Sequence, residues 1–160
     1  MTLRYYLLLS LCITPTILPT PSITTDEQAY VYCEHNHTTF IAIVWPITHQ
    51  KYDLFIEKTM NELGTIQYKK EVFLTPKQAT SLLKMAHPFI DDMKKHVAWY
   101  FPSSKTFANP ARIFVVTFKN RATAVACKSI IRHFIKLSYR PIHICDVHKE
   151  TMELAKFFFG

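Results

Sequence analysis

Apolar runs that favour β-strands alternate along the chain with segments whose apolar residues recur at helical spacing. The strand-like runs cover residues 40–45, 65–74, 111–118 and 142–145, and they are rich in β-branched and aromatic residues. The expected helices cover residues 49–63, 76–86, 91–100 and 120–137, followed by a last helix that starts at about Val147. This order predicts one domain in which helices pack on a sheet.

Two sheet arrangements are compatible with this alternation. Strands that alternate with helices are typical of a parallel α/β sheet. The direct turn from the first helix into the second strand, and the long helical stretch before the third strand, also fit a split βαβ sandwich with an antiparallel sheet. The pattern of residues alone leaves both arrangements open.

Several helix ends carry local signals. Thr75 and Gln78 have the spacing of a capping box, with a proline at the first helical position between them. Gly64 follows an amphipathic segment where a C-cap is expected. Asn120 and Asp146 stand at the starts of the last two expected helices, where either side chain can serve as an N-cap.

The first residues have the layout of a secretory signal peptide. Arg4 precedes an apolar run over residues 5–13, which is too short to span a bilayer before a proline interrupts it. We therefore predict a signal peptide over 1–22 and an exported protein, secreted or periplasmic, with a membrane anchor as the weaker alternative. A polar segment over 23–39 and a domain over 40–160 are expected to follow.

Charge and glycine content restrict the ligand. The formal net charge is +7 at pH 7, so an anionic partner such as a phosphate ligand is expected. The chain contains only two glycines, which excludes the glycine-rich loops of P-loop and dinucleotide-binding proteins. The sequence contains no DNA-binding motif. If a phosphate ligand binds, side chains must hold it.

A different chemistry is suggested near the N-terminus by Cys33, His35 and His37. Residues two apart on a strand point to one side, so these three would form a clamp for zinc or copper. A structural zinc site usually has four ligands, and a solvated segment is the favoured explanation of these three residues. We assign no metal ligand and keep an exported metal-binding protein as an alternative.

Several segments, read in order, resemble the nucleoside diphosphate kinase family. They are "FIAIVWP", "FIEKTMNELG", "VFLTPKQATSLLKMAH", the pair Ile131–Arg132, and "HICDVHKETMELAKFFF" at the end of the chain. The resemblance covers about residues 38–159, and the last segment is its most specific part. It implies an α+β fold, a ferredoxin-like βαββαβ sandwich with a four-stranded antiparallel sheet, and it is compatible with a homo-oligomer.

The resemblance also implies a catalytic histidine and a set of phosphate-binding cations. His143 takes the place of the histidine that accepts the γ-phosphoryl group from ATP with Mg²⁺, and Arg132 is the arginine of the family's Ile–Arg pair. Lys128 lies one helical turn before Arg132 and therefore on the same face of the expected helix, while Arg140 stands three residues before His143. We predict that these three cations bind a nucleotide or another anionic phosphate ligand.

The ring of a catalytic histidine needs a polar partner to orient it. Cys145 replaces the family's serine, and Leu154 replaces the glutamate that supports the ring, so Glu150 or Glu153 is predicted to act in its place. Trp45 stands where the family has a phosphate-binding lysine. These departures favour, as the alternative, a catalytically inactive exported module of the same fold with a binding or structural role.

Overall fold

A computed structural model of the protein describes residues 22–89, 91–136 and 141–160. The predicted signal peptide therefore lies outside the described residues except for its last position, and so does Arg140. Among the described helices, none combines the length and the apolar character that crossing a membrane requires.

The sheet has four strands, and every neighbouring pair of strands is antiparallel. Its strands are β1 (Thr39–Val44), β2 (Gly64–Val72), β3 (Ala111–Phe118) and β4 (Ile142–Ile144). Their order in the sheet is β2-β3-β1-β4, so β1 and β3 lie inside and the other two form the edges. The predicted α+β class with a four-stranded antiparallel sheet is confirmed, and the parallel alternative is wrong.

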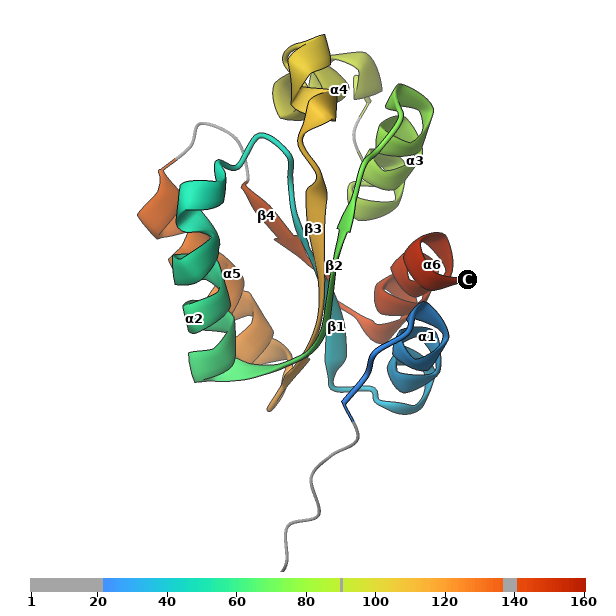
Figure 1. The fold of residues 1–160 in the computed structure, drawn as a ribbon, viewed down its shortest axis with the longest axis vertical. Helices are drawn as coiled ribbons and strands as arrows, with labels where there is room; N and C mark the ends of the chain where they lie inside the picture. Colours follow the sequence, from blue (N-terminus) through green and yellow to red (C-terminus); the bar gives the residue numbers. More distant parts are fainter. Residues whose placement is uncertain (1–21, 90, 137–140) are drawn as a thin grey trace, which may run out of the picture.

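Helices cover both faces of this sheet. They are α1 (Asp26–His35), α2 (Asp53–Leu63), α3 (Pro76–Ala86), α4 (Met93–Tyr100), α5 (Arg121–Ile135) and α6 (His148–Phe159), with short 3₁₀ turns at Gln50–Tyr52 and Ser104–Ala108. Figure 1 shows α2 and α5 side by side on one face, and α1 and α6 on the other, with α3 and α4 toward one end. The sheet is therefore the middle of three layers.

Helix α1 corrects the prediction of a polar segment over residues 23–39. A capping box holds its first turn. The Thr25 hydroxyl oxygen accepts a hydrogen bond from the backbone N–H of Gln28, and the side-chain oxygen of Gln28 accepts one from the backbone N–H of Thr25. Ala29 and Cys33, four residues apart, are fully buried. The remaining α1 positions are mostly polar, so the apolar stripe is too narrow to show as a helical pattern in the sequence.

The predicted caps are confirmed at Thr75 and Asn120, whose side chains accept hydrogen bonds from the backbone of Gln78 and Thr123. The prediction for Asp146 is wrong. Val147 occupies the N-cap position of α6 and provides no side-chain cap. The carboxylate of Asp146 instead accepts a hydrogen bond from the Lys128 ammonium at 2.7 Å, because the strand β4 ends beside helix α5.

Gly64 ends α2 as expected, but its backbone does not have the left-handed conformation of a usual glycine C-cap. Its backbone is extended, and β2 starts at this residue. A Cβ atom at this position would lie 2.6 Å from the carbonyl oxygen of Thr117 on β3. Glycine is therefore required by the close approach of two strands.

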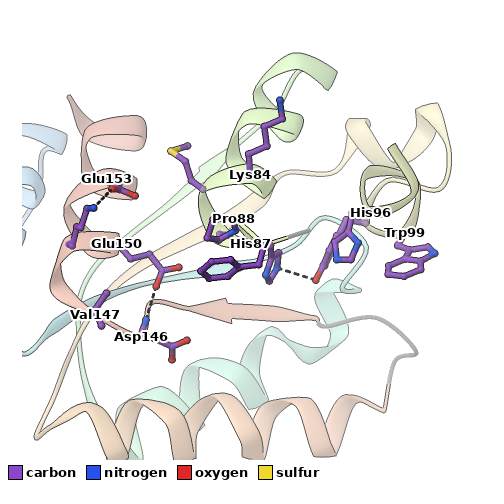
Figure 2. A pocket seen from close by; sticks show the side chains of 14 residues that line it. Lys84, His87, Pro88, His96, Trp99, Asp146, Val147, Glu150 and Glu153 are labelled. Carbon is purple, nitrogen blue, oxygen red and sulfur yellow. Dashed lines mark hydrogen bonds and ion pairs between the residues drawn. The ribbon is translucent and has the colours of Figure 1, made fainter. Parts of the chain in front are cut away.

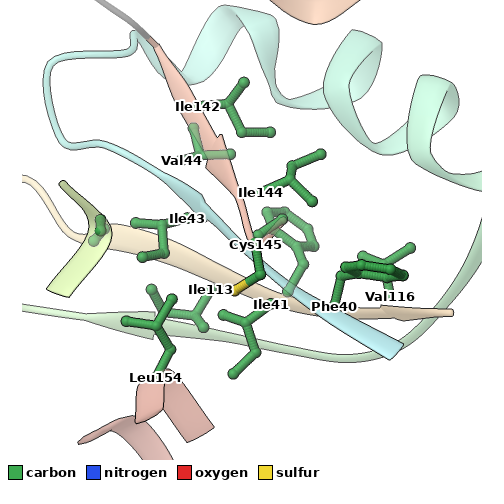
Figure 3. Close-up of a cluster of buried hydrophobic side chains, with 14 of the residues drawn as sticks. Phe40, Ile41, Ile43, Val44, Ile113, Val116, Ile142, Ile144, Cys145 and Leu154 are labelled. Atoms are coloured by element: carbon green, nitrogen blue, oxygen red, sulfur yellow. The ribbon is translucent and has the colours of Figure 1, made fainter. Parts of the chain in front are cut away.

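The core lies on both faces of β1, all six residues of which are buried. Side chains along a strand alternate between the two faces. Figure 3 shows the result: Ile142 and Ile144 point toward the α2–α5 layer, whereas Ile41 and Ile113 lie on the side of Leu154 in α6. The short strand β4 thus contributes its two isoleucines to the α2–α5 half of the core.

A buried ion pair lies in the α2–α5 layer. Nη2 of Arg112 on β3 is 3.0 Å from Oδ1 of Asp53, the first residue of α2, and it donates a hydrogen bond to the carbonyl oxygen of Thr48 at 2.8 Å. The Arg112 side chain is only 1% exposed and that of Asp53 25%. Burial lowers the pKa of Arg112 and raises that of Asp53. Asp53 therefore makes the largest contribution to compensating the Arg112 charge, and Glu71 and Glu57 add smaller ones.

A second polar cluster ties α1 to the edge strand β2. Asp26 accepts hydrogen bonds from the Lys70 ammonium at 2.6 Å and from the Tyr68 hydroxyl at 2.8 Å, and Lys70 also donates to the carbonyl oxygen of Phe158 near the end of α6. Burial by itself would raise the pKa of Asp26, but these hydrogen bonds outweigh it and hold the pKa below its ordinary value.

This depressed pKa predicts a pH-dependent contribution to stability. The ionised carboxylate stabilises the fold above the unfolded-state pKa of about 3.9, and its contribution is lost as the pH falls through the lower folded-state pKa. We expect urea titrations at pH 7 to show that Asp26→Asn is less stable than the wild type, and at about pH 3, below the unfolded-state pKa, to show a smaller difference. Glu27→Gln, on the same exposed helical turn, is the control. A difference between wild type and Asp26→Asn that is the same at both pH values would contradict this assignment.

Candidate functional site

His143 is the central residue of β4, and strand alternation turns its side chain toward the α6 layer. The residue is 4% exposed. Its Nε2 lies 2.7 Å from Oε1 of Glu150 in the first turns of α6, and Oε2 of Glu150 accepts the backbone N–H of Asp146, also at 2.7 Å. A carboxylate therefore bridges the imidazole and the backbone at the start of α6.

The other side of the imidazole is covered by residues from α3 and α4. The ring of His87, the residue that ends α3, meets the His143 ring edge to face with centroids 5.4 Å apart. Nε2 of His87 lies 3.5 Å from the Tyr100 hydroxyl, and the His96 ring lies beside His87 at 5.8 Å. His143 is thus enclosed between Glu150 and a group of histidine and tyrosine rings.

A cleft of about 1050 Å³ opens next to this enclosure. One wall comes from α3 and α4 and the other from the start of α6, and Figure 2 shows Glu150 and His87 between the two walls. The lining includes His87, His96, Trp99, Asp146, Glu150 and Glu153. Figure 2 therefore places the two residues that contact His143 at the surface of the cleft.

Of the predicted phosphate-binding cations, the two in the described part of the chain, Lys128 and Arg132, do not converge on the His143 ring. Lys128 donates to the carbonyl oxygen of Ile144 at 3.0 Å as well as to Asp146, and Arg132 donates through Nε and Nη2 to the carbonyl oxygen of Ile142 at 3.2 and 2.9 Å. Both cations come from α5, which packs on the opposite face of the sheet. They bond outward-facing carbonyl groups of β4, at its unpaired edge.

These hydrogen bonds are possible because the spacing of alternate carbonyl groups along β4 matches the rise of one turn of α5. Two residues along a strand advance about 6.6 Å, and four residues along a helix advance about 6 Å. Lys128 and Arg132, four residues apart, can therefore each reach one of two carbonyls that are two residues apart. The spacing that predicted a phosphate clamp serves the backbone of the edge strand instead.

Of the residues predicted to orient His143, Glu150 does so and Glu153 does not. Glu153 lies 4.0 Å from the Lys149 ammonium on the cleft wall. Cys145 lies on the same face of the sheet as His143 but is 1% exposed, and burial raises the pKa of its thiol far above the usual range. Leu154, where the resemblance places a glutamate, is fully buried in the core.

The predicted clamp of Cys33, His35 and His37 is not formed. Because residues 26–35 are helical, Cys33 points into the core whereas the His35 side chain is 71% exposed. His37 instead packs against His148, with ring centroids 4.2 Å apart. The prediction of a shared side assumed a strand, and the capping box at Thr25 was the signal that could have corrected it.

Four residues of the cleft and its surroundings were not singled out by the sequence analysis: His87, His96, Trp99 and Tyr100. They come from the end of α3 and from α4, where the sequence shows no ligand-like spacing. Position 87 lies near where the resembling family uses a tyrosine, and this was the one available signal.

The chain matches no known protein-family model, and it shows no similarity to any curated protein. The functional argument therefore depends on the geometry of the cleft and of the group around His143.

Proposed function

We propose that the protein is a binding module with a ferredoxin-like βαββαβ fold, and that it binds a nucleotide or a related phosphate ligand in the cleft between α3–α4 and α6. The observation that carries this proposal is the enclosure of His143 beside an open cleft. A histidine held by Glu150 and covered by His87 shapes the wall of a binding site, and it offers little access for attack on a phosphate.

The order of the elements supports the fold. β1, α2 and β2 make one half and β3, α5 and β4 the other, with α2 and α5 on the same face of an antiparallel sheet in the order β2-β3-β1-β4. Two such split halves are the arrangement of the ferredoxin-like sandwich. In this proposal α1 and α6 are additions that cover the second face.

Two features of the cleft support a nucleotide ligand. Trp99 is 38% exposed and lies next to His96, with ring centroids 4.6 Å apart, so its ring offers a stacking surface for a base. The start of α6 has no side-chain cap, and its backbone N–H groups favour a phosphate. Lys128 forms an ion pair with Asp146, and Lys149 forms one with Glu153. The two lysines offset the negative charge of these two acids.

Tryptophan fluorescence tests this proposal. Trp99 lines the cleft, whereas Trp45, the other tryptophan, is fully buried in the core. We expect ATP or GTP with Mg²⁺ to quench Trp99 in a saturable way, and Trp99→Phe to abolish the change while Trp45 still reports a folded core. Trp99→Ala, measured by calorimetry because the fluorescent reporter is removed, should weaken binding about fivefold or more, because base stacking contributes about 1–3 kcal/mol.

Leu54→Ala is the matched control for this titration, because Leu54 is 83% exposed on α2 at the opposite face. It should bind as the wild type does. If nucleotides at millimolar concentration produce no saturable change in correctly folded protein, the module does not bind nucleotides.

Phosphoryl transfer is a second candidate, and one contact favours it. A carboxylate oxygen only accepts hydrogen bonds, so Nε2 of His143 donates to Glu150. In the neutral ring Nδ1 then keeps the free lone pair needed to form a P–N bond as the bond between the γ-phosphorus and the ADP oxygen breaks. This route requires His87 to move away from His143.

Incubation with γ-labelled ATP and Mg²⁺ separates the two candidates. For a binding module we expect no acid-labile, base-stable label on the wild type. A label that appears on the wild type, persists in His96→Ala and is lost in His143→Ala would replace the binding module with a phosphotransferase.

A further inference from the structure

The side chains of His143, Cys145 and Glu150 bring three kinds of metal-ligating atom together beneath the cleft. A ring nitrogen of His143, Sγ of Cys145 and a carboxylate oxygen of Glu150 all lie within 4.8 Å of one another. His143 and Cys145 are two residues apart on the same face of the chain at β4, and Glu150 reaches back from α6. This is the one group of its kind in the described part of the chain.

We propose that these three residues bind a divalent metal ion, and that the donor set suits Zn²⁺. Imidazole nitrogen, thiolate sulfur and carboxylate oxygen are the three ligand types that zinc accepts, at about 2.0–2.3 Å from the ion. Magnesium and calcium prefer oxygen ligands, so a site with one oxygen donor discriminates against both ions. Three protein ligands leave a fourth position for water or another small ligand.

The surroundings meet three requirements of such a site. The three ligands come from two elements whose relative position is set by the core, since Leu154 of α6 and Ile144 of β4 are fully buried. Glu150 is held from behind by the backbone N–H of Asp146, which orients a ligating carboxylate. Glu150 also lines the cleft, so an ion can arrive from solvent.

Binding changes the protonation of two groups. The Cys145 thiol loses its proton to solvent as the metal–sulfur bond forms. Neutral His143 gives its Nε2 proton to solvent and takes one up at Nδ1, so that Nε2 and Glu150 Oε1 can both coordinate the ion. A tetrahedral ion with bonds of about 2.0–2.3 Å holds its ligand atoms about 3.5 Å apart. Nε2 of His143 and Oε1 of Glu150 must therefore separate from 2.7 Å, while the most distant pair, within 4.8 Å, closes up. Small side-chain rotations supply this movement, since the residues lie on adjoining short segments.

Cobalt substitution tests the site in the full chain. Metal-free protein titrated with Co²⁺ should develop the thiolate-to-cobalt charge-transfer absorption and the visible bands of a tetrahedral ion, saturating at one equivalent, and Zn²⁺ should remove them. Cys145→Ser should abolish the charge-transfer band. Glu150→Gln should weaken Zn²⁺ binding at least about tenfold, and circular dichroism should confirm that it is folded.

Matched variants test whether Cys127 or the N-terminal histidines contribute to the spectrum. Cys127→Ser removes an equally buried cysteine on α5. His35→Ala with His37→Ala removes the histidines of the alternative clamp. Both proteins should keep the wild-type spectrum. No saturable spectrum, a charge-transfer band that survives in Cys145→Ser, or one that is lost in Cys127→Ser would overturn the proposal. Nucleotide binding is measured separately by Trp99 fluorescence, so the failure of one proposal leaves the other intact.

Discussion

Asp53→Ala is expected to lower the free energy of unfolding by about 3 kcal/mol, because it leaves the buried Arg112 guanidinium without its ion-pair partner. The value lies at the lower end of the range for broken buried pairs, since Asp53 itself is partly exposed and water can reach the vacated position. Urea unfolding at pH 7 measures the change.

A double variant separates the cost of an unpaired charge from lost packing. Arg112→Met with Asp53→Ala removes both charges and keeps an apolar side chain of similar length at position 112. We expect it to be more stable than Asp53→Ala alone, because replacing a whole buried pair by apolar groups is often nearly neutral. Equal stability of the two proteins would mean that the ion pair is not what Asp53→Ala disrupts.

Leu154→Ala is expected to cost about 3 kcal/mol, the middle of the range for a leucine removed from a packed core. Leu154 is fully buried against Ile41 and Ile113, as Figure 3 shows. Thermal and urea unfolding give the value. Leu154→Met, which keeps the volume, should cost at most about 1.5 kcal/mol.

The same position tests the resemblance to nucleoside diphosphate kinases. If the family's glutamate could be restored here, Leu154→Glu would fold and support His143. We expect the opposite, a loss of folded protein, because this carboxylate would enter an apolar core without a partner. A stable Leu154→Glu protein would show that this part of α6 is packed less tightly than the structure indicates.

The elements of this fold were predictable where periodicity and caps agree. The strand over residues 111–118 and the helix over residues 76–86 are confirmed with the same limits, since the first is a continuous apolar run and the second has a capping box at Thr75. Helix α1 was missed because a helix that buries mainly Ala29 and Cys33 has little apolar periodicity. Pairing between strands that are distant in the sequence decided the antiparallel sheet, and no local pattern reports it.

The sequence indicated residues that belong to the candidate site, but it gave less information on the directions in which their side chains point. Sequence spacing placed Lys128 and Arg132 on one helical face, but it does not tell which side of the sheet that helix covers. The sequence also indicated Glu150 or Glu153 as the partner of His143. In the structure Glu150 is the partner, because β4 lies beside the first turns of α6. The α3–α4 wall of the cleft depends on how two helices pack at one end of the sheet.

The two edges of the sheet differ in how they can meet another chain. On β4, the outward carbonyls of Ile142 and Ile144 are already occupied by side chains of α5. A docking peptide strand would have to displace an ammonium and a guanidinium before it could pair there. The β2 edge has an irregular register between Ile66 and Tyr68 and then two lysines, features that oppose intermolecular strand addition. Assembly of this protein through a continuous intermolecular sheet is therefore disfavoured at both ends.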